Sequence, residues 1–375
     1  MAQVEKHSEL NAFLDSVFIM SSSNSTKAAY RLGINKFQKF LKERYQFGEI
    51  ELAHKVKKDD FDVYKILGEF VVYLSQLGYK PKSLRVWLPA VNGYLRHLGI
   101  KIYREEFNSR VRMPKVFLTR EEGLSKETIL RVLHNSPPKL QTAILVAVAT
   151  GMRLGEIVQI KISDVDFGTT PTRIKIRAEI SKGKQAREVF LTLEATKALK
   201  DYLGRFFGWK EGQVNANLRN TIIFGRTSLV KAVRKEERHL RGPSMEIAAN
   251  VLQKMLEHTL EKIPELNTKG ENDRKIIHFH AFRKYFRTVV GNEVNRDFAE
   301  ALMGHRFYLD TYYALTDEKR QEMYIKAEPY LTISDFTKIE KTLKGVSEKQ
   351  KEIEERLAKV ELDRIQVPDY LLNKH

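Results

Sequence analysis

The sequence predicts a mainly α-helical protein with a small β-hairpin, and three observations support this fold class. Apolar residues recur at helical spacing through the first hundred residues. Apolar and polar residues alternate over 172–180, and a second strand-like run at 187–193 follows a short polar turn. A heptad pattern runs through the Lys- and Glu-rich tail. We expect four parts, which are an N-terminal helical domain over 1–110, a linker over 111–125, a mixed α/β domain over 126–335 and a C-terminal heptad helix over 336–375.

The N-terminal domain is predicted to contain helices over 24–45, 61–77 and 84–98. Apolar residues recur every three or four positions in each segment, and Pro89 is expected to kink the third helix. The basic residues between the apolar stripes are Lys36, Lys39, Lys42, Arg44, Lys80, Lys82, Arg85 and Arg96. They form either an ordinary solvated face or a surface that binds phosphates, and the overall charge favours the second interpretation.

The chain carries an excess of positive charge, with 65 Lys and Arg against 48 Asp and Glu and a net charge of +17 over 375 residues. This balance favours an anionic partner, nucleic acid before a membrane surface, although the charge could serve solubility alone. The lack of cysteine excludes disulfides, zinc–thiolate sites and thiol nucleophiles. The sequence has neither a signal peptide pattern nor a run of about 18 apolar residues, so we expect a cytoplasmic protein.

The second domain is predicted to combine helices with the hairpin. Ile174, Ile176 and Ala178 are expected on one face of the first strand, and SKGKQA at 181–186 forms the turn. Residues 222–224 suggest a further short strand. Apolar spacing predicts helices that begin near Ser125 and that cover 140–149, 242–263, 280–291, 294–303 and 311–327.

Two short motifs carry arginines suited to phosphate chemistry. Gly151 ends an apolar helix, and Arg153 near the next helix start can present its planar guanidinium to a phosphate, with Glu156 one turn away to hold it. Further along, His280 and Arg283 are three residues apart and share a face of a helix. An ordinary Arg–Glu helix pair and a capping His beside a surface Arg are the structural alternatives.

A third motif joins a histidine to tyrosines. Gly304 and His305 end an apolar helix, and Tyr312 and Tyr313 follow within eight residues of that histidine. A tyrosine can act as a nucleophile if nearby cations stabilise its phenolate, although most tyrosines simply pack in a core. The pair His278 and His280 lacks a neighbouring carboxylate–histidine helix motif, so we expect no metal. The sequence has no GxxxxGK(S/T) phosphate loop either, and we expect no cofactor.

In chain order these motifs resemble those of the tyrosine recombinase (phage integrase) family, in particular the integrases of archaeal viruses and mobile elements. The resemblance covers about residues 118–330, and the N-terminal helices resemble the core-binding domain of the family only in pattern. It rests on four stretches, which are Thr150-Gly151-Met152-Arg153-Leu154-Gly155-Glu156, the lysine-bearing hairpin from Ser181 to Arg187, His280-Ala281-Phe282-Arg283 and Leu302-Met303-Gly304-His305.

The resemblance implies an enzyme that cleaves and rejoins double-stranded DNA through a 3′-phosphotyrosine, with four protomers exchanging strands through a Holliday junction and no metal. The catalytic residues it implies are Arg153, Lys182, His280, Arg283, His305 and Tyr313. Two departures stand out. Tyr313 lies eight residues after His305, where the family often has nine, so Tyr312 stays an alternative. Lys284 occupies a position where many relatives carry histidine.

Three other interpretations remain at this point. A type IB topoisomerase shares the same side-chain chemistry and relaxes supercoils as a monomer. A relative that binds DNA without catalysis is a second possibility, and a membrane-surface protein is a poor third because the basic residues do not gather opposite one apolar face. The heptad tail either forms a coiled coil or packs as a single helix on the protein's own body.

Overall fold

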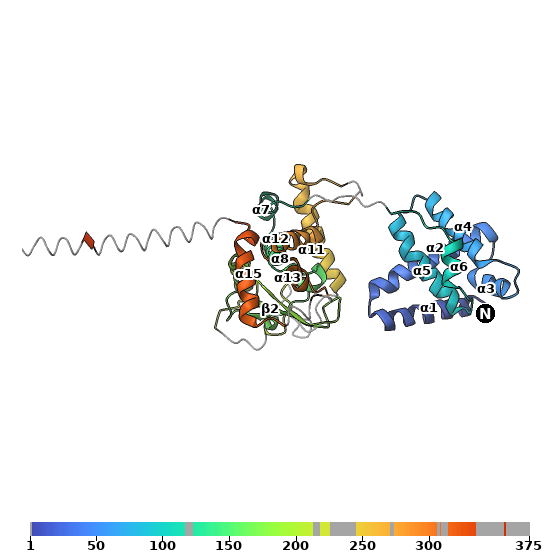
Figure 1. The fold of residues 1–375 in the computed structure, drawn as a ribbon, viewed down its shortest axis with the longest axis horizontal. Helices are drawn as coiled ribbons and strands as arrows, with labels where there is room; N and C mark the ends of the chain where they lie inside the picture. The colour runs from blue at the N-terminus through green and yellow to red at the C-terminus, as the bar shows by residue number, and fades with distance from the viewer. Residues whose placement is uncertain are drawn as a thin grey trace, which may run out of the picture. The chain divides into compact units, whose positions relative to one another are not determined.

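The computed structural model forms two compact units, Met1–Leu118 and Thr119–His375, here called the N-terminal unit and the C-terminal unit (Figure 1). The predicted heptad helix over 336–375 lies outside the described residues except for positions 356–357. The structure describes residues 2–116, 123–212, 218–225, 245–270, 274–305, 308, 314–334 and 356–357.

The described part of the N-terminal unit is helical. Three of its helices match the predicted segments, and their starts follow from local chemistry: the Ser23 and Asp62 side chains accept hydrogen bonds from the first turns of α2 and α4, and Pro81 opens α5. Pro89 lies inside α5, which continues to His97. The helices are α1 (Ala2–Ser21), α2 (Asn24–Tyr45), α3 (Glu49–Lys57), α4 (Val63–Gln76), α5 (Pro81–His97) and α6 (Arg104–Arg110).

The core of the N-terminal unit is aromatic. Phe37, Phe40 and Phe70 are fully buried, and the Phe70 ring centroid lies 5.1 Å from that of Phe37 and 5.4 Å from that of Phe40. Such ring pairs add to the free energy gained by burying apolar area. The buried contact between α2 and α4 is therefore apolar at its centre, and the hydroxyls of Tyr45 and Tyr73 add hydrogen bonds to Glu69 and Glu43 at its edge.

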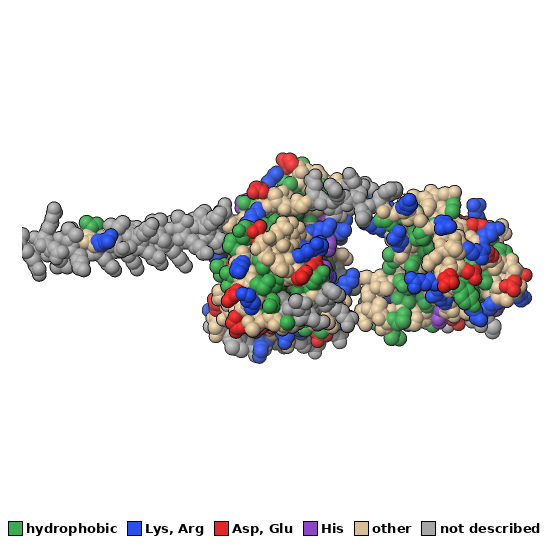
Figure 2. Space-filling model, in the orientation of Figure 1, with side chains coloured by type: hydrophobic (Ala, Val, Ile, Leu, Met, Phe, Trp, Pro, Cys, Tyr) green, Lys and Arg blue, Asp and Glu red, His purple; other side chains and the backbone are tan. Residues whose placement is uncertain are grey.

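The basic residues predicted between the apolar stripes are mostly exposed, and Figure 2 shows Lys and Arg side chains interleaved with Asp and Glu over the visible face of this unit. Lys36 is the exception, because it is half-buried and its Nζ donates to the Tyr79 hydroxyl at 2.6 Å. The same ammonium lies 4.0 Å from the Tyr79 ring centroid and 5.0 Å from that of Trp87. Lys36 therefore stabilises the unit's own packing through cation–π contacts.

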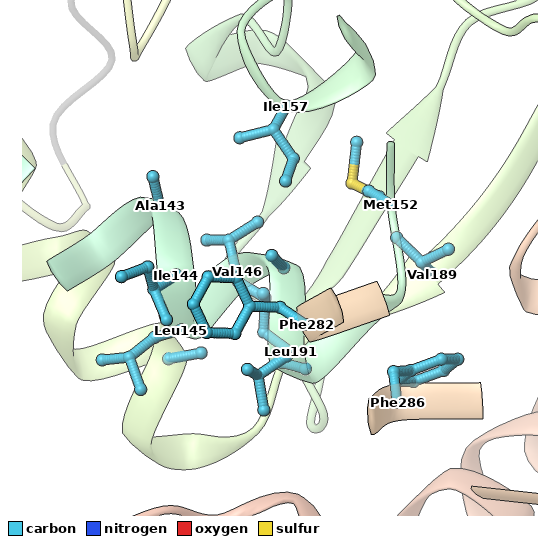
Figure 3. Close-up of a cluster of buried hydrophobic side chains, with 14 of the residues drawn as sticks. Ala143, Ile144, Leu145, Val146, Met152, Ile157, Val189, Leu191, Phe282 and Phe286 are labelled. Carbon is cyan, nitrogen blue, oxygen red and sulfur yellow. The ribbon is translucent and has the colours of Figure 1, made fainter. Parts of the chain in front are cut away.

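The C-terminal unit is built around the buried helix α8, against which α7, α10 and α12 pack (Figure 1). Figure 3 shows Phe282 of α12 among the α8 side chains Ile144, Leu145 and Val146. The helices of this unit are α7 (Lys126–His134), α8 (Pro138–Thr150), α9 (Leu154–Ile157), α10 (Leu193–Phe207), α11 (Met245–Glu261), α12 (Phe279–Glu293), α13 (Arg296–Leu302) and α15 (Asp317–Leu331), with short 3-10 turns at Ile162–Asp164 and Pro264–Leu266.

The hairpin is present, but its strands are shorter than predicted. The antiparallel sheet has the order β1 (Val165–Asp166), β2 (Arg173–Ile176), β3 (Arg187–Phe190), with Ile174 opposite Val189. Ile174 and Ile176 are buried as expected, whereas Ala178 lies in the turn. The second strand ends at Phe190, because the Thr192 side chain caps α10 by accepting from the Ala195 amide.

Two further expectations need correction. Residues 222–224 make only a single β-bridge, between Ile222 and Lys161, instead of a strand. The helix predicted over 311–327 begins at Asp317 among the described residues, since residues 314–316 are not helical. None of the described helices combines the length and the apolar character needed to cross a membrane.

A close approach at Gly151 brings α12 onto the end of α8. Gly151 has φ +62°, and a Cβ added there would overlap the Phe286 ring. A larger residue would therefore clash with Phe286 as well as strain the backbone. This contact places Arg283, one turn before Phe286 on α12, beside the segment that carries Arg153.

Candidate active site

Arg153 is held in place by the glutamate three residues later. Its backbone N–H donates to Glu156 Oε2 at 2.9 Å, and its Nη1 donates to Glu156 Oε1 at 3.1 Å. Nη1 also lies 3.4 Å from the Met303 carbonyl oxygen, which belongs to the Gly-His motif 150 residues away. Its side chain keeps 27% of its surface exposed, so an anion can still reach the guanidinium.

Arg283 shares the Met303 carbonyl with Arg153 and is almost fully buried. Its Nη1 donates to the Gly151 carbonyl, and its Nη2 donates to the Met303 carbonyl at 2.8 Å and contacts His305 Nε2 at 3.3 Å. Burial and the nearby charge of Arg153 lower the pKa of Arg283 to about 9, which still leaves the group charged at neutral pH. An anion bound here would relieve the repulsion between the two guanidinium groups.

His305 is oriented by a buried carboxylate that the sequence analysis did not identify. Its Nδ1 pairs with Glu300, which is 3% exposed and also pairs with Arg287 of α12. Burial would raise the pKa of Glu300, but hydrogen bonds from Arg287 and His305 outweigh it and lower that pKa. The other ring nitrogen of His305 therefore faces Arg283.

A second missed residue, Arg187, lies buried behind the site at the start of β3. Its Nη2 donates to Glu156 Oε2 at 2.7 Å, and its Nε donates to the Leu302 carbonyl at 2.8 Å. A Cβ added at Gly304, where φ is +75°, would lie 2.7 Å from Arg187 Cζ, so only glycine fits against this guanidinium. Arg187 thus connects Glu156 to the Gly-His motif. The only signal in the sequence was an arginine that opens a short strand.

Glu156 is the common partner of Arg153 and Arg187 and is 1% exposed. Burial alone would raise the pKa of Glu156, but Arg187 and Arg153 more than compensate, so the pKa is lowered. The carboxylate therefore stays charged and keeps both guanidinium groups in fixed positions.

Lys182 is exposed in the turn between β2 and β3. A Cβ added at the next residue, Gly183, would lie 3.9 Å from the Gly304 carbonyl oxygen. The turn that carries Lys182 therefore lies against the Gly-His motif, from which a long flexible lysine can reach a group bound at the arginines.

His280 is exposed in the first turn of α12. Partial desolvation and the charges of Arg283 and Lys284 lower the pKa of His280, so its ring is mostly neutral at pH 7 and able to accept a proton. The preceding histidine, His278, is buried, and its Nδ1 lies 2.9 Å from the Ile276 carbonyl oxygen. Of the two histidines, His280 is the one accessible to a ligand.

Tyr312 and Tyr313 lie outside the described residues, so their distances to the arginines are not part of this geometry. Tyr324 is described and is fully buried, with its hydroxyl donating to the Ala149 carbonyl at 2.7 Å. Burial raises the pKa of Tyr324 well above its ordinary value. This tyrosine is therefore a core residue unsuited to act as a nucleophile.

The structure brings Arg153 and Arg283 together at the Met303 carbonyl, with His305 in contact with Arg283. The turn that carries Lys182 lies against Gly304, and His280 lies one turn before Arg283 on α12. Such a set of donors suits an oxyanion that carries more than one negative oxygen. Among the described residues, no group of three His, Asp or Glu side chains is arranged to hold a metal ion.

Comparisons with known proteins agree on one family. Residues 122–318 match the model of the phage integrase family. Tyrosine recombinase XerA of Thermococcus onnurineus is 31% identical over 137 residues, which is 36% of this chain and 46% of that protein. XerA of Pyrococcus furiosus is 25% identical over 139 residues, with the same coverage. The matched region thus spans about half the length of these curated relatives.

Solved structures with a similar fold include lambda integrase. A dimer of its residues 75–356 bound to a COC′ core site gives a TM-score of 0.53 at 17% identity, and the match covers 80% of this chain and 94% of that one. A lambda integrase tetramer bound to a Holliday junction gives a TM-score of 0.50 at 16% identity, covering 80% and 77%. At these identities the likeness shows the fold.

Proposed function

The chain belongs to the phage integrase family, the tyrosine recombinases, and we propose that it is a site-specific recombinase that cleaves and rejoins DNA through a 3′-phosphotyrosine intermediate. The observation that carries this proposal is that Arg153 and Arg283 both donate to the Met303 carbonyl oxygen, with His305 in contact with Arg283. These donors come from three motifs far apart in the chain, and their preorganised charge suits a phosphodiester in its transition state. The net charge of +17 supports DNA as the substrate.

In the first step the phenol oxygen of Tyr313 attacks the scissile phosphorus in line. The new P–O bond forms as the bond to the 5′ oxygen breaks, and the non-bridging oxygens gain charge. Arg153 and Arg283 stabilise that charge, and His305 donates a hydrogen bond to one of these oxygens.

Two proton transfers accompany this step. His280, with its lowered pKa, accepts the phenolic proton, and Lys182 gives a proton to the departing 5′ oxygen. The resulting 3′-phosphotyrosine conserves the energy of the broken bond. A 5′ hydroxyl from a second strand then reverses the step and joins the two strands, without ATP.

We propose double-stranded DNA in the cell interior as the partner and a homo-tetramer as the assembly that completes strand exchange. The support is the lambda integrase tetramer on a Holliday junction, whose fold this chain shares. Phosphate contacts of this kind make affinity fall steeply with salt.

The test is a suicide DNA substrate, nicked next to the cleavage site so that the attacking 5′ end is lost. We expect a covalent adduct whose peptide, sequenced by mass spectrometry, carries the nucleotide on Tyr313. Tyr313→Phe should bind DNA without forming an adduct, while Tyr312→Phe should still form one. An adduct on Tyr312 would overturn the choice of nucleophile, and relaxation of supercoiled DNA that lacks any attachment site would favour a topoisomerase instead.

A further inference from the structure

Glu300 is a buried carboxylate close to the reacting groups, and none of the proposed steps uses it. It lies on α13, five residues before His305, and is 3% exposed. One of its oxygens pairs with His305 Nδ1 and the other with the Arg287 guanidinium. A buried carboxylate is costly to ionise unless it is paired, so both contacts are needed to keep Glu300 charged.

The contact determines which ring nitrogen of His305 carries a proton at rest. An ionised carboxylate only accepts hydrogen bonds, so Nδ1 must be the protonated nitrogen beside Glu300. Nε2 then faces Arg283 Nη2 at 3.3 Å and can only accept from it. The ring is thereby fixed with Nε2 toward the centre where the arginines meet.

A bound phosphate changes what His305 must do. To donate to a phosphate oxygen, Nε2 needs a proton of its own, which makes the ring a cation. The Glu300 carboxylate next to Nδ1 keeps the ring in the orientation from which Nε2 can reach that oxygen. Arg287 lies on the far side of Glu300 with 45% of its side chain exposed, so it holds the carboxylate in place while remaining partly hydrated.

We propose that Glu300 is a positioning residue for DNA cleavage, which orients His305 toward the scissile phosphate, with Arg287 holding Glu300 in place. This inference rests on the proposed recombinase function. Glu300 touches neither substrate nor nucleophile and acts through His305 alone. The pair corresponds to the carboxylate–histidine arrangements that fix tautomer and orientation at other catalytic centres.

The experiment is a double-mutant cycle on single-turnover cleavage of the suicide substrate, using Glu300→Gln, His305→Gln and the double variant. We expect Glu300→Gln to slow cleavage about 10–100-fold, the usual range for such partners, while DNA affinity stays within about 3-fold. In the His305→Gln background the same change should have almost no further effect, because the group through which Glu300 acts is gone. Equal losses in both backgrounds, or no loss in either, would overturn the proposal.

Two control variants separate a loss of catalysis from a loss of folding. Glu300→Gln combined with Arg287→Gln removes both charges of the pair, so no unpaired guanidinium remains, and it should slow cleavage as much as Glu300→Gln alone. Asp164→Asn is the matched control, because Asp164 is a buried carboxylate paired with Arg177 that contacts none of the proposed catalytic side chains. Cleavage by Asp164→Asn should stay within about 3-fold of the unsubstituted protein, and an equal loss there would point to general destabilisation.

The two proposals fail in different ways. If the unsubstituted chain forms no covalent adduct on any attachment DNA, the recombinase function itself is wrong. If it forms the adduct and Glu300→Gln forms it at the same rate, only the role of Glu300 is wrong.

Discussion

The two units of the molecule bury different kinds of side chains. Among the described residues of the N-terminal unit, Glu49 is the only charged side chain that is buried, and the core is otherwise apolar and aromatic. The C-terminal unit buries Glu156, Arg187, Arg283 and Glu300 within one connected set of contacts. Buried charges reduce stability unless every one is paired. The stability of the C-terminal unit therefore depends on ion pairing as well as on apolar packing.

The difference between the two units is tested most strongly by replacing Arg187, the buried arginine that pairs with Glu156. Arg187→Met should destabilise the C-terminal unit by about 3–5 kcal/mol, because Glu156 loses a fully desolvated partner. The matched change in the other unit, Arg110→Met, disrupts a half-exposed pair with Asp62 and should cost only about 0–1 kcal/mol. Denaturant unfolding of both variants measures how much unfolding free energy each one loses. Equal losses would show that the two units do not differ in their dependence on buried ion pairs.

The next largest effect concerns the arginines that face the anion. Arg153→Ala and Arg283→Ala should each lower the cleavage rate about 100- to 1,000-fold, since one lost transition-state donor costs about 2.7–4 kcal/mol. DNA affinity should change only several-fold, because each arginine acts mainly on charge that develops in the transition state. Rates come from single-turnover cleavage and affinities from titration at fixed salt. Cleavage at full rate by either variant would contradict the assignment of the centre.

A smaller effect is expected at the exposed edge of the centre. Lys182→Ala should slow cleavage of ordinary DNA about 100-fold, the lower end for a lost general acid. A strand with sulfur in place of the bridging 5′ oxygen should be cleaved at a nearly unchanged rate, because a thiolate leaves without a proton. If both strands slow equally, the acid is another group, with Lys184 in the same turn as the next candidate.

The smallest effect is a pH dependence of stability in the C-terminal unit. The pKa of Glu156 is lower in the folded protein than its ordinary value of 4.5, so its stabilisation is complete above that value and is lost as the pH falls through the folded pKa. The difference in melting temperature between the unsubstituted protein and Glu156→Gln should therefore shrink from pH 7 toward pH 3.5. A melting-temperature difference that does not vary with pH would show that Glu156 stabilises the unit through packing and not through its charge.

Much of the helical framework could be predicted because its signals are local. α2, α4, α5 and α8 follow from apolar spacing, and Gly151 ends α8 in the left-handed conformation that glycine favours. The same pattern lies in α1, where Leu10, Phe13, Leu14 and Val17 are buried, although we did not predict that helix. The end of β3 was harder to predict, because Thr192 is common both in strands and at helix N-termini. In the folded protein Thr192 caps α10.

The sequence by itself determined the chemical groups and their order, since Arg153, the hairpin lysine, His280 with Arg283 and the Gly-His motif all lie in short recognisable stretches. The tertiary structure alone decided which charges are buried and with whom they pair. Arg187 meets the Leu302 carbonyl across 115 positions of the chain, and Arg153 meets Met303 across 150. The local spacing of apolar residues does not predict such pairs. The free energy of a buried charge depends on groups that only folding brings within a few ångströms.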